Sequence, residues 1–336
     1  MVPEGVSRVG PLPRCDPLEL DYRGKAPQVE MISNDPIDPM LGNYELVTLR
    51  GGVRSIRSVI HGETMHVGTD PRTEALELHV GQQEIVKRAL EYRVTQPASP
   101  FIIWDIGLGP AANAISAMTA LRDASQTRRE NGDVEPAPSV EIHSFEISTE
   151  VLEFALSHAG ALGYLSGWES TVADLLLHGR VEVDPSILWT LHRGDFSRES
   201  HEAPSPNAIF HDPYSPTRNP EMWSLETFAS EWKVVEDRED RKSGPCILTN
   251  YTRSTAVRVT MLLAGWFVGK GVPTGEKTET TIAANRIELL EAPLGGEWLS
   301  RVRSSTNASP IRGRNYERGP IAPEDYAKLC KLPQFA

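Results

Sequence analysis

The chain has 336 residues, of which 39% are hydrophobic, enough for one large domain with extensions or two modest domains. No apolar run approaches the roughly 20 residues that a membrane helix needs, and the N-terminal stretch lacks the apolar core of a secretory signal. The three cysteines are scattered without a CxxC pair, so we expect no metal site and a reducing, cytoplasmic setting. A net charge of −12 means that any RNA binding must depend on a local basic patch.

The N-terminal quarter divides into two parts. Residues 1–43 are rich in Pro, Gly and Asp without periodicity, which indicates an irregular arm. Residues 44–94 are interpreted as a lead-in of strands and a helix. Within it, alternation over 44–67 predicts a hairpin and a further short strand, and helical spacing of apolar residues predicts a helix over 72–92.

Strands and helices alternate between residues 95 and 291, which we interpret as one domain. Alternation of this kind implies parallel pairing with right-handed crossovers. The sequence therefore predicts an α/β fold with a doubly wound, mostly parallel, Rossmann-like sheet of seven strands. A polar stretch at 123–139 is interpreted as a surface insertion. The predicted strands are 101–106, 140–145, 187–192, 208–211, 245–250, 266–268 and 278–284, and the predicted helices are 111–121, 149–158, 221–232 and 254–264.

The alternation is lost after residue 292, and residues 292–336 form a basic C-terminal extension. This segment could be a basic surface for a partner or an extension wrapped on the core, and we favour the second interpretation. Its basic residues, set against four acidic ones, are Arg301, Arg303, Arg312, Arg314, Arg318, Lys328 and Lys331.

A glycine-rich turn follows the first strand of the α/β region. Gly107 and Gly109 stand between the predicted strand and the next helix, where glycines allow a tight turn and close approach of a ligand. The helix N-terminus beyond them offers free N–H groups. A plain strand-to-helix turn is the alternative.

Acidic residues follow the next two strands. Glu146 is placed to accept hydrogen bonds from ribose hydroxyls, and Asp195 from an adenine amino group, with Phe196 packing on the purine. Taken alone, Asp195 is more often a helix cap or turn residue. The third glycine of a dinucleotide fingerprint is missing and no GKS or GKT loop follows a strand, so an adenosyl cofactor without phosphates fits best.

The fourth strand ends in a loop that carries Asp212, just before Pro213, and Tyr214, between Pro213 and Pro216. Pro213 and Pro216 stiffen this loop, so a carboxylate and an aromatic ring would be presented at the mouth of the site. Asp212 would hold or deprotonate a substrate amine while Tyr214 packs on a planar group. A rigid proline-rich turn without function is the alternative.

Several segments carry motifs that together are specific. The most specific is the string HDPYSPTRNPEMW within 208–228. The others are DIGLGPAAN (105–113), IHSFEIS (142–148), HRGDF (192–196), LTNYTRSTAVRVTMLLAGW (248–266) and, more weakly, GETMHVGTDPRTEALELHV (62–80). Together these segments resemble one family, the MnmC-like tRNA wobble-uridine methyltransferases.

The resemblance implies a class I methyltransferase fold, S-adenosyl-L-methionine as cofactor and methylation of the 5-aminomethyl group on the wobble uridine of tRNA. It implies a catalytic role for Asp212 and places Glu74 where the family often has an acid. The family's flavin-dependent oxidase half is not recognised here, and its usual third glycine is replaced by Ala111. The expected substrate-binding residues are Tyr214, Ser215 and Arg218, and the expected cofactor-binding residues are Asp105, Gly107, Gly109, Asn113, Glu146, Asp195 and Phe196.

For a tRNA substrate, Tyr214 and Trp223 are candidate stacking platforms, although Trp223 fits a buried helix position better. Phosphate contacts would come from Arg218, Arg253 and the basic extension, while Arg253 and Arg258 could equally be surface charges of a helix. His61, His66, His143 and His211 lack metal-ligand spacing and are interpreted as structural or surface residues.

Three alternatives stay open at this point. The first is a methyltransferase of a small-molecule or peptide amine, which the acidic charge favours. The second is a non-catalytic adenosyl-binding protein, suggested by Pro110 and Ala111. A nicotinamide oxidoreductase is the most distant.

Overall fold

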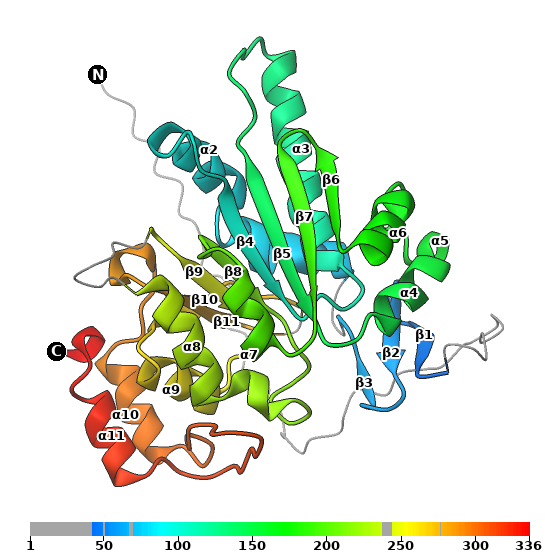
Figure 1. The fold of residues 1–336 in the computed structure, drawn as a ribbon. Coiled ribbons are helices and arrows are strands. Elements are labelled where there is room, and N and C mark those ends of the chain that lie inside the picture. The colour runs from blue at the N-terminus through cyan, green and yellow to red at the C-terminus, as the bar shows by residue number, and fades with distance from the viewer. Residues whose placement is uncertain (1–41, 50, 67–69, 237–243, 276) are drawn as a thin grey trace, which may run out of the picture.

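The computed structural model describes residues 42–336, except residues 50, 67–69, 237–243 and 276 (Figure 1). The predicted irregular arm therefore lies almost wholly outside the described residues. The centre of the molecule is an eight-stranded sheet. Its order is β10 (Phe267–Gly271), β11 (Thr280–Ala284), β9 (Ile247–Asn250), β8 (Ala208–His211), β4 (Phe101–Ile106), β5 (Val140–Glu146), β7 (Ile187–Arg193) and β6 (Arg180–Asp184).

The strand pairing confirms the predicted fold class. β9, β8, β4, β5 and β7 pair in parallel, and β11 runs antiparallel to both β9 and β10. The sheet has one strand more than the sequence predicted, because β6 pairs antiparallel with β7 at the edge. Its sequence, RVEVD, has exposed or half-buried charges at an edge and no buried residue, so it lacks the apolar signal of the central strands.

Successive strand residues bury themselves on opposite faces of the sheet, which gives the protein two apolar cores. Ile103 joins the core beneath α3 (Ala112–Glu130), α4 (Glu150–Ser157) and α6 (Glu169–His178). Trp104 joins the core beneath α8 (Leu225–Val235) and α9 (Thr255–Leu263). Figure 1 shows these two helical layers on either side of the strands.

Helix α3 is longer than the sequence predicted. The polar stretch at 123–139 begins as helix up to Glu130, and only the rest connects to β5. The helix continues because most residues of this end are Arg, Gln, Glu or Ala, which are good helix formers, and the end projects beyond the sheet (Figure 1). Arg128 then forms an ion pair with Asp133 just after the helix.

The lead-in forms its own small sheet, as predicted: β1 (Tyr44–Thr48), β2 (Arg54–Ser58) and β3 (Glu63–Thr64) are antiparallel. The predicted single helix over 72–92 is instead three pieces: α1 (Pro71–Ala75), the π-helical η2 (Leu76–Gly81) and α2 (Ile85–Thr95). Glu84 interrupts the helix with a left-handed backbone at φ 49°. Apolar spacing predicted helix but could not reveal this break.

The C-terminal segment packs on the core instead of leaving it. It contains α10 (Gly296–Ser304) and α11 (Pro323–Leu329), whose Trp298, Val302 and Leu329 are buried in the core under α8 and α9. Gln334 donates to the carbonyls of Val268 and Leu294 at 2.7 and 2.9 Å. The favoured interpretation of a wrapped extension therefore agrees with the packing, while all seven basic residues named above are exposed.

Within the described part of the chain, no helix is both long enough and apolar enough to cross a membrane. The same residues contain no group of three or more His, Cys, Asp or Glu side chains arranged to hold a metal ion.

Candidate active site

The glycine turn after β4 lies directly against the loop after β8. Gly107 has φ 83°, in the left-handed region that favours glycine. A Cβ on Gly107 would lie 2.8 Å from the carbonyl oxygen of Asp212 and 2.9 Å from Cα of Pro213. A side chain would collide with backbone there, so glycine is required for the two loops to touch. Two predicted site segments are thus brought together.

The third position of the turn is unusual. Ala111 adopts φ 64° and is fully buried at the start of α3. A left-handed backbone costs a non-glycine residue about 1–2 kcal/mol. Ala111 therefore keeps the conformation that a glycine would adopt easily. The carbonyl oxygen of Pro110 next to it accepts a hydrogen bond from the hydroxyl of Tyr164 at 3.1 Å.

Two of the predicted cofactor carboxylates lie at this turn. Glu146 accepts hydrogen bonds from the backbone N–H of Gly109 at 2.9 Å and of Ile147 at 2.9 Å. Burial raises its pKa, and these N–H donors oppose the rise. Asp105 is fully buried, accepts from the hydroxyl of Ser144 at 2.8 Å, and has its pKa raised by burial to about 7.

Asp212 lies immediately beyond the end of β8. Its Oδ2 accepts a hydrogen bond from Nδ2 of Asn113 in α3 at 2.8 Å. Burial raises the pKa of Asp212 to about 6, with the charge of His66 and the Asn113 hydrogen bond acting in the opposite direction. Because this pKa lies near neutrality, the carboxyl can both hold and release a proton under ordinary conditions.

The lead-in contributes two titratable groups that the sequence did not bring together with Asp212. Nδ1 of His66 lies 3.2 Å from Oε2 of Glu74, and both side chains are largely buried. Burial lowers the pKa of His66, but the hydrogen bond and charge of Glu74 outweigh it, so the net pKa is raised. The negative charge of Asp212 also raises it. His66 was interpreted as structural, and no spacing between positions 66 and 212 could have linked them.

The expected substrate-binding residues are held by the small N-terminal sheet. Glu63 of β3 accepts from the backbone N–H of Ser215 at 3.1 Å and also from the Ser215 hydroxyl. Nε of Arg218 lies 4.0 Å from the same carboxylate. Tyr214 packs on His61 with ring centroids 4.5 Å apart. The lead-in thus fixes the loop that follows Asp212.

The two residues predicted to contact adenine, Asp195 and Phe196, have different environments in the structure. Asp195 is exposed and caps the short helix α7 (Phe196–Glu199) through the backbone N–H of Ser197 at 2.9 Å. Hydrogen bonds from Ser197 hold its pKa below the ordinary value, and the positive charges of Arg198 and Arg314 add to the effect. Phe196, by contrast, is buried edge-on against Trp104, so its expected packing on a purine does not match its position.

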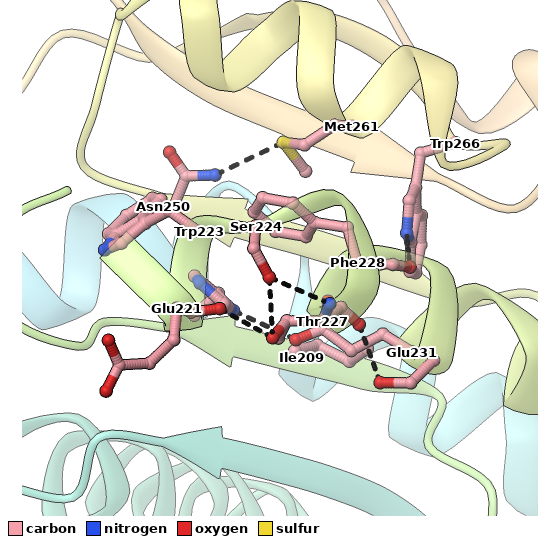
Figure 2. Close-up of polar contacts among 12 residues, drawn as sticks. Ile209, Glu221, Trp223, Ser224, Thr227, Phe228, Glu231, Asn250, Met261 and Trp266 are labelled. Carbon is pink, nitrogen blue, oxygen red and sulfur yellow. Dashed lines mark hydrogen bonds and ion pairs between the residues drawn. The ribbon is translucent and has the colours of Figure 1, made fainter. Parts of the chain in front are cut away.

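An aromatic block supports the Asp212 loop on the side of α8. Trp223 is fully buried, which agrees with the buried position that the sequence favoured over stacking on a base. Its indole N–H donates to the carbonyl of Tyr214 at 2.8 Å. Figure 2 shows Ser224 capping α8 through Thr227 and the indole of Trp266 bonded to the carbonyl of Phe228. Beside this block, His211 pairs with Glu231 at 3.1 Å.

Two arginines of the predicted helix region 254–264 and the residue before it have different surroundings. Arg253 is exposed and donates to the hydroxyl of Thr278 at 3.2 Å. Arg258 is buried and donates to Glu279 at 2.8 Å and to the carbonyl of Thr280 at 2.7 Å. The interpretation of Arg258 as a surface charge is wrong, because this guanidinium is buried and bonded inside the protein.

The donor set at the glycine turn fits S-adenosyl-L-methionine. This cofactor carries a positive sulfonium and ribose hydroxyls but no phosphate. Asp105, Glu146 and Asp212 supply three carboxylates at one sheet edge, and within the described residues Oδ1 of Asp105 is buried without a hydrogen-bond partner. Carboxylates shielded from water attract a cation, whereas they would repel a phosphate.

The fold and this site define the class: the chain is an S-adenosyl-L-methionine-dependent methyltransferase of the class I architecture. Residues 170–286 match a family described as S-adenosyl-L-methionine-dependent methyltransferase, which confirms the predicted family resemblance. The matched range includes Asp195 and Asp212, while the glycine turn and Glu146 precede it.

A solved structure supports this fold. MnmC2 from Aquifex aeolicus is 22% identical, with a TM-score of 0.57, and the match covers 86% of this chain and 85% of that chain. Spermidine synthase from Thermotoga maritima is 12% identical with a TM-score of 0.41, over 86% of this chain and 84% of that chain. No curated protein matches the sequence.

Proposed function

We propose that this protein transfers a methyl group to a primary amine, the 5-aminomethyl group on the wobble uridine of tRNA. The observation that carries the proposal is the position of Asp212. Its backbone touches the glycine turn at Gly107, and its half-buried carboxylate has a pKa of about 6. A proton-accepting group thus lies beside the turn proposed to hold the cofactor.

We assign the cofactor site to Asp105, Gly107, Gly109, Glu146 and Asp195. In this proposal Glu146 accepts from the ribose hydroxyls and Asp195 from the adenine amino group. Asn113 acts indirectly, since its amide already donates to Asp212. Phe196 supports the site from the core. S-adenosyl-L-methionine supplies an electrophilic methyl group.

The residues around Asp212 would prepare the amine. An alkyl amine has a pKa near ~10, so it arrives protonated and must lose a proton before its lone pair can attack. Asp212 attracts the ammonium and takes its proton, and the His66–Glu74 pair tunes the local charge. S-adenosyl-L-methionine held at the glycine turn would supply its methyl group to this lone pair, and its sulfur would keep the electron pair of the broken carbon–sulfur bond. Alignment of the two groups accounts for much of the rate, up to about 7–11 kcal/mol in well-oriented reactions.

Support for a tRNA substrate comes from the family resemblance of residues 208–228 and from exposed basic groups. Arg314 in the C-terminal extension is close enough to Asp195 to lower its pKa, so part of this extension borders the proposed site. Arg218 is half exposed beside the Asp212 loop. These arginines offer the local positive charge that a protein with a net charge of −12 needs to approach RNA.

We also propose that the described part of the chain is divided into three segments with different roles. Residues 44–94 are the lead-in that fixes the Asp212 loop, residues 95–291 are the methyltransferase domain, and residues 292–336 are the extension. Both flanking segments pack on the central domain.

The test uses purified protein with S-adenosyl-L-methionine and tRNA carrying 5-aminomethyluridine at the wobble position. Nucleoside mass analysis should show one added methyl group on that uridine. The same tRNA without the aminomethyl group is the control and should gain none. Methyl transfer to neither tRNA nor amines would reject the proposal.

A methyltransferase of a small free amine is the second candidate, favoured by the charge of −12. The same assay distinguishes it when a panel of small primary amines is added in place of tRNA. Turnover of a small amine with none of the modified tRNA would select this alternative.

A further inference from the structure

A lysine of the protein itself lies on an aromatic ring beside the proposed site. The ammonium nitrogen of Lys277 is 4.5 Å from the centroid of the Tyr251 ring. Lys277 and Thr274 also exchange backbone hydrogen bonds of 3.0 and 3.2 Å, which fix the backbone that carries the lysine. The contact therefore joins the β10–β11 connection to the residue that follows β9.

Tyr251 is tied to the loop that carries Asp212. Its hydroxyl donates to the carbonyl oxygen of Pro213, the residue after Asp212, at 3.1 Å. Trp223 packs edge-on to the Tyr251 ring at 5.5 Å and 81°. Since both ends of the ring are held, its orientation relative to Asp212 is fixed.

The charges around Lys277 come from the same site. Burial lowers its pKa, and the negative charges of Glu74 and Asp212 act in the opposite direction. The charge of Arg253 lowers it further. Lys277 thus places a primary alkylammonium on the aromatic face of Tyr251, where the charges of Glu74 and Asp212 act on it.

We propose that the face of Tyr251, with the carboxylates of Glu74 and Asp212, is the subsite for the substrate's alkylammonium, and that Lys277 fills it until substrate displaces it. This inference rests on the proposed function and adds a recognition residue, Tyr251, and an internal competitor, Lys277. An ammonium over an aromatic face gains about 0.5–2 kcal/mol, depending on desolvation. The same interaction that holds Lys277 would hold a substrate amine.

An internal competitor has a consequence for specificity. A tethered group competes at an effective concentration of the order of millimolar. A small free amine, with few other contacts, is then excluded at ordinary concentrations. A large substrate that gains binding energy elsewhere, such as from phosphate contacts, can still displace the lysine. Lys277 would therefore select for large amine substrates.

The experiment replaces the lysine by a neutral side chain of similar length. Lys277→Met is titrated with n-butylammonium chloride by calorimetry, in the presence of S-adenosyl-L-homocysteine. We expect at least about tenfold tighter binding than in the wild type, because the competitor is gone. Lys270→Met is the matched control, since Lys270 is exposed in the same hairpin, and it should leave binding unchanged. Adding Tyr251→Leu to Lys277→Met should abolish the gain.

Equal binding of butylammonium by Lys277→Met and the wild type would overturn the inference and make Lys277 a structural counter-charge. Binding of S-adenosyl-L-homocysteine is measured first in every variant, because the proposed function predicts that all of them bind the cofactor. If S-adenosyl-L-homocysteine binds but the affinity for butylammonium is unchanged, only the role of Lys277 is rejected. A second measurement uses the wild-type protein, so it does not depend on whether a variant folds. Nuclear magnetic resonance should show the ring-current shift of the Lys277 ε-methylene, and butylammonium should remove it. A shift that persists at saturation also contradicts displacement.

Discussion

Asp212 lies between two regions of opposite character. On the side of the lead-in are charged and polar groups, His66, Glu74 and the Glu63 carboxylate that holds the next loop residues. On the side of α8 are buried aromatic rings, Trp223 and Phe228, with the His211–Glu231 pair among them. The first region sets the charge of the site, and the second holds the strand end rigid.

The difference predicts separable effects of mutation. Changes in the polar region should alter turnover and its pH dependence with little loss of stability, because burying charge costs free energy in the folded state. Changes in the aromatic block should reduce stability first, because they leave cavities. Substitutions and pH measurements in each region test this separation.

The largest effect is expected at the carboxylate itself. Asp212→Asn should reduce turnover about 100- to 10,000-fold, the range for loss of a positioned general base. The amide can still accept the Asn113 hydrogen bond, so S-adenosyl-L-homocysteine should bind within a few-fold of wild type, measured by calorimetry. Asp123→Asn, on the exposed part of α3, is the control. Near-normal turnover in Asp212→Asn would reject the role of Asp212.

A large loss of stability is expected in the aromatic block. Phe228 is fully buried and packs on His211 with ring centroids 5.0 Å apart. Phe228→Ala should lower the free energy of unfolding by about 3–5 kcal/mol, measured by urea denaturation. If the aromatic block affects only stability, Phe228→Ala that is kept folded at low temperature has the same pH dependence of kcat as the wild type. A shifted pH profile would show that the two regions are not separable.

The pH dependence should report Asp212. Its pKa of about 6 predicts that kcat at saturating substrate loses roughly a factor of ten for each pH unit below that value, since only the ionised form accepts a proton. Asp212→Asn should remove this break from its residual rate. A wild-type profile without a break between pH 5 and 7 would contradict the assignment.

The raised pKa of Asp212 also predicts that the contribution of this carboxyl to the stability of the protein falls with rising pH, whereas the activity rises. The folded protein binds this proton more tightly than the unfolded chain, whose carboxyl has the ordinary pKa of 3.8. The contribution of Asp212 to stability therefore falls as the pH rises from 3.8 to about 6 and is constant above that. Asp212→Asn should make the protein about 1–3 kcal/mol more stable at pH 7, seen in urea denaturation. A loss of stability there would contradict the burial of an ionised carboxylate.

The smallest effect is expected at the glycine turn. Ala111→Gly relieves a left-handed alanine but gives the unfolded chain more freedom. The two terms oppose each other, so a stabilisation of no more than about 1 kcal/mol is expected, with cofactor affinity within about threefold. A large change in affinity for S-adenosyl-L-homocysteine would show that Ala111 sets the shape of the turn.

The sequence by itself determined the alternation of strands and helices, the glycine turn, and the acidic residues at successive strand ends. These features are local: buried strands are short apolar runs, and turns need glycine and proline. The position of Asp212 beside Gly107 also followed from topology, because parallel strands bring their carboxyl ends to one edge. Edge strand β6 and the break at Glu84 escaped detection, since one has no buried residue and the other depends on a single backbone angle.

Only the tertiary structure decided what surrounds Asp212. His66 and Lys277 are each more than 60 residues from it in the sequence, yet their charges act on its pKa. Phe196 turned into the core and Arg258 became buried for similar reasons, as their partners come from other elements. Long-range packing selects such partners through burial and charge, and neither leaves a periodic signal in a single sequence.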